Sequence, residues 1–142
     1  MKNTAILLIL FLLLGGCSGD DQVQRNPYLP DLNFSFQLNL NLPQYNPLNY
    51  PGNSFVTYNY GINGIVIYNL NNEQYLAFEL TDPNHIPTEC SYLEVDQTRA
   101  ACACEDGNTY TIITGQLLTG EGPYSLKPYR ISRTGNVLEV WN

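Results

Sequence analysis

The stretch "LNFSFQLNLNLP", residues 32–43, alternates apolar and polar side chains along its whole length. Successive side chains of an extended strand point to opposite faces, so this alternation predicts a strand with one buried and one exposed face. The side chains expected on the buried face are Leu32, Phe34, Phe36, Leu38, Leu40 and Leu42.

Six further runs are short and rich in β-branched and aromatic residues, which favour strands. They are "SFVTYNY" (54–60), "GIVIYN" (64–69), "QYLAFEL" (74–80), "TYTIIT" (109–114), "LKPYRIS" (126–132) and "VLEVWN" (137–142). Turn-forming residues such as Asn63-Gly64 and Asp106-Gly107-Asn108 separate them. After residue 16, no stretch of ten residues has the apolar spacing of a helix. The sequence therefore predicts an all-β domain, with short antiparallel strands in packed sheets or a partly open barrel.

The N-terminal stretch "MKNTAILLILFLLLGGC", residues 1–17, has one lysine, an apolar run over 5–14 and two glycines before Cys17. The apolar run is shorter than the roughly 20 residues that a membrane-spanning helix needs, so residues 1–16 are expected to be a signal peptide. The end of the run resembles a bacterial lipobox, in which the signal peptidase cuts before an acylated cysteine. We therefore expect Cys17 to be lipidated and to anchor the protein in the membrane.

Residues 17–30 are polar and acidic and contain prolines. Such a segment buries little apolar surface, so a flexible tether is expected there, followed by one domain over 31–142. Asp20 and Asp21 resemble the acidic signal that carries some lipoproteins to the cell surface, which leaves the periplasm and the cell surface both open. In either place the domain lies in the cell envelope outside the cytoplasm, where disulfides persist.

The charge of the chain excludes one class of partner. The full sequence has six basic and thirteen acidic residues, and removal of residues 1–16 would take away Lys2. Nucleic-acid binding requires clustered lysine and arginine to neutralise phosphates, so no nucleic-acid partner is expected. The expected partners are the membrane, through the lipid, and another protein of the envelope.

The C-terminal stretch "CACEDGNTYTIITGQLLTGEGPYSLKPYRISRTGNVLEVWN", residues 102–142, points to a family when it is read with "YLAFEL" and the loop that contains His85 and Cys90. Together they resemble the cluster-binding half of a Rieske iron-sulfur domain. That family has a Cys-x-His loop and a Cys-x-x-His loop, followed by an aromatic strand, a Thr-Gly turn, a Gly-Pro segment and a closing hairpin. The resemblance implies a Rieske-like all-β fold and, where the ligands are complete, a [2Fe-2S] cluster that carries electrons.

A Rieske cluster needs two thiolates on one iron and two imidazoles on the other. On the second loop, the resemblance places Cys102 at the thiolate position and Glu105 at the histidine position. One alignment of the first loop places Cys90 at the thiolate position and Tyr92 at the histidine position.

The alignment that keeps the register of the preceding strand instead places Asp82 and Asn84 at these positions, with His85 one residue further on. It leaves Cys90 where some Rieske domains carry an extra cysteine that is bridged to the second cysteine of the other loop, here Cys104. His85 is the only histidine of the chain, so under either alignment two imidazoles cannot be supplied.

Three hypotheses follow. The favoured one is a scaffold without a cluster, with a Cys90–Cys104 disulfide and an unpaired Cys102, that acts as a binding or structural module and not as an enzyme. The second is a zinc site made by His85, Cys90, Cys102 and Cys104. The third is a variant [2Fe-2S] cluster that still carries electrons, with Asp82 or Glu105 as an unusual ligand.

Overall fold

The computed structural model describes residues 25–142, so the expected signal peptide and Cys17 lie outside the described residues. The described chain is almost entirely β, which confirms the predicted fold class. In chain order its elements are β1 (Ser35–Asn39), the 3-10 helix η2 (Pro43–Asn49), β2 (Ser54–Thr57), β3 (Ile65–Asn69), β4 (Tyr75–Glu79), β5 (Leu93–Asp96), β6 (Arg99–Cys102), β7 (Thr109–Thr111), β8 (Leu117–Thr119), β9 (Pro128–Thr134) and β10 (Val137–Trp141).

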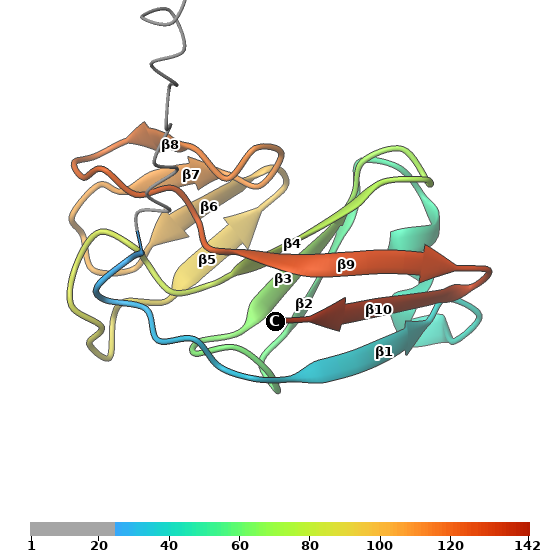
Figure 1. The fold of residues 1–142 in the computed structure, drawn as a ribbon. Helices are drawn as coiled ribbons and strands as arrows, with labels where there is room; N and C mark the ends of the chain where they lie inside the picture. The colour runs from blue at the N-terminus through green and yellow to red at the C-terminus, as the bar shows by residue number, and fades with distance from the viewer. Residues whose placement is uncertain (1–24) are drawn as a thin grey trace, which may run out of the picture.

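Two antiparallel sheets make up the domain and lie at opposite ends of it (Figure 1). The larger sheet has six strands in the order β1-β10-β9-β4-β3-β2, and the smaller has four in the order β5-β6-β7-β8. The chain enters the smaller sheet after β4 and returns to the larger one at β9, which pairs with β4. The smaller sheet is therefore an insertion between two neighbouring strands of the larger one.

The opening alternation forms β1 as predicted over its central residues. Phe36 and Leu38 are buried opposite Val140 and Leu138 of β10. Leu42 differs from the prediction: 43% of its surface is exposed. The strand ends at Asn39, and Leu42 instead precedes the first turn of η2.

The helix η2 was not predicted, because its seven residues are too short to show helical periodicity. It places Leu48 in the core of the larger sheet, where this side chain is fully buried. The side-chain amide of Asn69 donates a hydrogen bond to the Leu48 carbonyl at 2.9 Å, which ties the helix to the end of β3.

Strand β3 is buried on both faces, which explains why its sequence does not alternate. Ile65 and Ile67 pack into the core of the larger sheet. Val66 and Tyr68, on the opposite face, pack into a second core shared with the smaller sheet. Tyr110 of β7 lies in this second core and is fully buried.

Residues 26–30 lie on the domain, which differs from the expectation that the tether extends to residue 30. Leu29 is only 5% exposed, and the Asn26 side chain donates a hydrogen bond to the Pro83 carbonyl at 2.7 Å. Lys127 donates a hydrogen bond to the Pro30 carbonyl at 2.8 Å. Within residues 25–142, no helix is long and apolar enough to cross a membrane.

Candidate functional site

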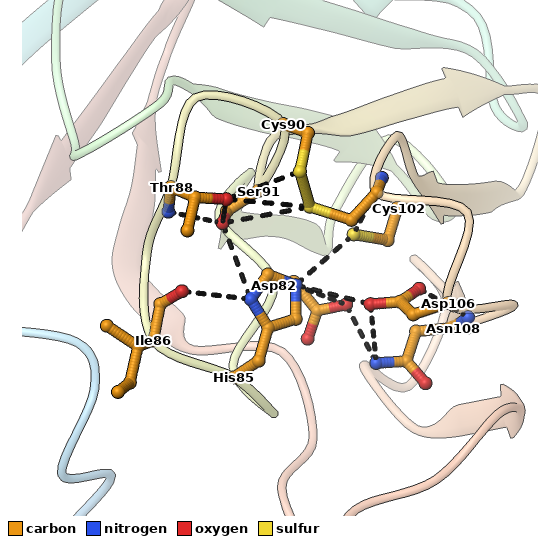
Figure 2. Close-up of a disulfide and its surroundings, with 10 residues drawn as sticks. Asp82, His85, Ile86, Thr88, Cys90, Ser91, Cys102, Asp106 and Asn108 are labelled. Atoms are coloured by element: carbon orange, nitrogen blue, oxygen red, sulfur yellow. Dashed lines mark hydrogen bonds and ion pairs between the residues drawn. A yellow bond between two sulfur atoms is a disulfide. The ribbon is translucent and has the colours of Figure 1, made fainter.

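Two loops meet beside the smaller sheet and form the candidate site (Figure 2). The first loop, residues 80–92, connects β4 to β5, and the second loop, residues 103–108, connects β6 to β7. A disulfide between Cys90 and Cys104 joins them. This is the pairing that the Rieske resemblance implied.

Cys102 ends β6 and is the one free cysteine of the described residues. Its Sγ lies 3.4 Å from Nε2 of His85, and the Cys104 backbone N–H donates to it at 3.5 Å. The two cysteines of the Cys-x-Cys motif therefore have different roles, since Cys104 closes the loops and Cys102 faces the histidine.

His85 has two carboxylates on the same side as Cys102. Its Nε2 is 3.2 Å from Oδ2 of Asp106 and 3.8 Å from Oδ2 of Asp82. Its other ring nitrogen, Nδ1, lies 3.0 Å from the Ile86 carbonyl. When Nδ1 donates its hydrogen to that carbonyl, the Nε2 lone pair is directed toward the thiol and the carboxylates.

Asp82 is fully buried, and both of its oxygens accept hydrogen bonds. Oδ1 accepts from the Asn84 backbone N–H at 2.7 Å and from the Tyr110 hydroxyl at 2.8 Å, and Oδ2 accepts from the Asn108 side chain at 3.0 Å. Burial, with a further contribution from the Asp82 carboxylate, raises the pKa of Tyr110 above its ordinary value, so the hydroxyl keeps its proton and donates.

Burial also raises the pKa of the Cys102 thiol to about 12, and the nearby charges of Asp82 and Asp106 act in the same direction. Without a cation at the site, Cys102 is therefore a protonated thiol at neutral pH. A divalent cation would reverse this preference, because its charge stabilises the thiolate.

Asn84, which the alignment placed at a histidine position, has a structural role. Its side-chain amide donates to the Tyr110 hydroxyl and to the Tyr124 carbonyl, both at 2.8 Å, and its Oδ1 accepts from the Tyr124 backbone N–H at 2.8 Å. Gly122 lies so close that an added Cβ would come within 2.2 Å of Oδ1. Asn84 therefore fastens the first loop to the segment before β9.

The structure places the other expected ligands differently. Glu105, which the resemblance placed at a histidine position, is exposed, and within residues 25–142 its side chain has no hydrogen bond or ion pair. Its φ of 59° turns the chain, and Asp106 faces His85 instead. Tyr92, which one alignment placed at the histidine position of the first loop, is 41% exposed. In this structure Cys90 and Cys104 are bonded to each other, so they are not thiolates and the zinc set of His85 with three cysteines is not assembled.

The order of elements agrees with the resemblance, because two loops that each follow a strand come before the closing hairpin β9–β10. The structure adds that the two loops meet beside a small antiparallel sheet that is inserted into a larger one. The fold is Rieske-like. No protein-family model matches the chain, and no curated protein matches it.

Several solved structures resemble the chain. A chain of the complex of reduced oxygenase and oxidised ferredoxin in carbazole 1,9a-dioxygenase is 19% identical over 64% of this chain and 82% of its own length, with a TM-score of 0.45. The plasma membrane Rieske protein PetC3 of Synechocystis is 24% identical over 54% of this chain and 75% of its own, also with a TM-score of 0.45. A putative NADH-dependent nitrite reductase small subunit of Mycobacterium tuberculosis is 14% identical over 79% of this chain and 97% of its own length, with a TM-score of 0.44.

Proposed function

We propose that this protein is a lipoprotein of the cell envelope, anchored through Cys17, whose Rieske-like domain carries no [2Fe-2S] cluster and acts as a binding or structural module. The shortage of cluster ligands carries the proposal, because Cys104 is bonded to Cys90 and the chain has a single histidine. A Rieske cluster needs two thiolates and two imidazoles, whereas the loops offer only Cys102 and His85.

The geometry of the remaining donors supports this proposal. Atoms of Asp82, His85, Cys102 and Asp106 all lie within 4.8 Å of one another, so they converge on one point. A cluster with two irons needs its ligands in two pairs, one pair for each iron. The residues present therefore do not fit a [2Fe-2S] cluster. The disulfide keeps the two loops together without one.

The alternative function is electron transfer through a variant cluster. Its support is that Cys102 and His85, two ligands of the types a Rieske cluster uses, lie 3.4 Å apart between the two loops.

The visible absorption spectrum and the iron and sulfide content would decide between the two functions, when they are measured on protein matured in its own host and purified with its lipid. We expect no visible absorption from an iron-sulfur cluster, and iron and acid-labile sulfide far below one per chain. As a control, a Rieske protein with all four ligands is purified in the same way and must retain its cluster. Stoichiometric iron together with sulfide in this protein would overturn the proposal and establish the alternative.

A further inference from the structure

Four donors of three chemical kinds meet between the two loops (Figure 2). They are a carboxylate oxygen of Asp82, Nε2 of His85, Sγ of Cys102 and a carboxylate oxygen of Asp106. Asp82 and His85 come from the first loop, Cys102 ends β6, and Asp106 comes from the second loop. Residues 24 positions apart in the chain are thus brought to one point.

The spacing of these donors suits a single tetrahedral ion. Bonds of about 2.0–2.3 Å from zinc to nitrogen, oxygen and sulfur imply donor-to-donor distances of about 3.3–3.6 Å in a tetrahedron. From His85 Nε2, the observed distances are 3.2 Å to Asp106, 3.4 Å to Cys102 and 3.8 Å to Asp82. These three distances agree with the required ones to within a few tenths of an ångström, and the other three donor pairs lie within 4.8 Å.

Three of the four donors, His85, Asp82 and Asp106, are also oriented by a hydrogen bond on the far side of the side chain. Nδ1 of His85 lies 3.0 Å from the Ile86 carbonyl, and Oδ1 of Asp106 accepts from the Asn108 backbone N–H at 2.9 Å. Asp82 Oδ1 accepts from Tyr110, while Asp82 Oδ2 and Asp106 Oδ2 both face His85 and both accept from the Asn108 side-chain amide, at 3.0 and 3.3 Å. Partners of this kind fix the orientation of metal ligands and raise the affinity for the ion.

The charge of the site favours a cation. Within the described chain, the only ion-pair partner of Asp82 and of Asp106 is His85, and no lysine or arginine pairs with either carboxylate. His85 and Asp106 are 27% and 29% exposed, so an ion can reach the site from solvent.

We propose that Asp82, His85, Cys102 and Asp106 bind one divalent transition-metal ion of the zinc class, in place of the cluster that the fold could otherwise hold. A mixed set of nitrogen, sulfur and oxygen donors suits zinc, whereas Mg²⁺ and Ca²⁺ take oxygen ligands alone. Cys102 binds as the thiolate, and its proton passes to solvent. Because the protein fills all four positions, the ion stabilises the two loops instead of activating a water molecule.

Titration of the full lipidated chain, with its disulfide intact and bound metal first removed by a chelator, tests the site. We expect calorimetry with Zn²⁺ to give one ion per chain, and Co²⁺ to produce a thiolate-to-cobalt charge-transfer band. Cys102→Ser should abolish that band, and Asp106→Asn should weaken Zn²⁺ binding at least about 10-fold.

Glu105→Gln provides the matched control, because it removes one charge from the neighbouring residue of the same turn, whose side chain is exposed. It should leave the affinity unchanged. Circular dichroism of each variant checks that the fold is intact. Absence of saturable 1:1 binding would overturn the proposal. Binding that Cys102→Ser and Asp106→Asn leave unaltered would overturn it as well.

Discussion

Glu79 is a fully buried carboxylate that is stabilised entirely by hydrogen-bond donors. Oε2 accepts from the Ile62 backbone N–H at 2.8 Å and the Tyr129 hydroxyl at 2.6 Å, and Oε1 accepts from the Asn63 backbone N–H at 3.0 Å and the Thr81 hydroxyl at 2.8 Å. Burial, followed by the charge of Glu79, raises the pKa of Tyr129, so its hydroxyl remains a donor. All four surrounding groups therefore donate to the carboxylate.

Replacing this carboxylate by an amide should destabilise the domain. In Glu79→Gln, the side-chain NH₂ group must face donors, so at least one buried hydrogen bond is lost, at a cost of about 1–3 kcal/mol in the free energy of unfolding. Urea denaturation followed by tryptophan fluorescence measures the change. Glu73→Gln, in the exposed turn before β4, is the matched control and should stay within about 0.5 kcal/mol of wild type. Equal stability of the two variants would contradict the prediction.

At the scale of elements, the first and second loops are held together by the Cys90–Cys104 disulfide, which closes a segment of 14 residues. A bridge over a loop of this length removes conformational entropy from the unfolded chain, which stabilises the fold by about 3 kcal/mol in the chain-entropy model. The bridge also brings Cys102 and Asp106 of one segment to His85 of the other.

The double variant Cys90→Ser/Cys104→Ser should therefore lose about 3 kcal/mol of stability in urea denaturation. A reductant provides the control. It should lower the stability of the wild type to about that of the double variant and leave the double variant unaffected. If the wild type and the double variant unfold at the same urea concentration under non-reducing conditions, the disulfide does not contribute as expected.

At the scale of the whole molecule, the proposed anchor is chemical and lies at Cys17. Cys17→Ala should leave the precursor without lipid, and the domain should then be released from membranes by a carbonate wash, because a short apolar run alone does not anchor stably. Fractionation with immunoblotting measures this, and metabolic labelling with a fatty acid should be lost in parallel. Ser18→Ala, at the next position, should remain lipidated and membrane-bound. Full retention of Cys17→Ala in the washed membranes would refute the lipid anchor.

The sequence alone determined the fold class, because strand periodicity is a local property. Alternate positions of β1 bury Phe36 and Leu38 as predicted, since neighbouring side chains of any strand point to opposite faces. The resemblance to Rieske domains also placed Cys102 and His85 near each other, because it carries the order of the loops along the chain.

Only the tertiary structure decided which carboxylates complete the site and which segments lie on the domain. The resemblance placed Glu105 at a ligand position, but a positive φ at that residue turns the chain, and Asp106 faces His85 instead. The burial of Leu29 and of both faces of β3 depends on segments distant in the chain. The physical reason is that periodicity reports the face on which a side chain lies, whereas long-range packing decides what that face contacts.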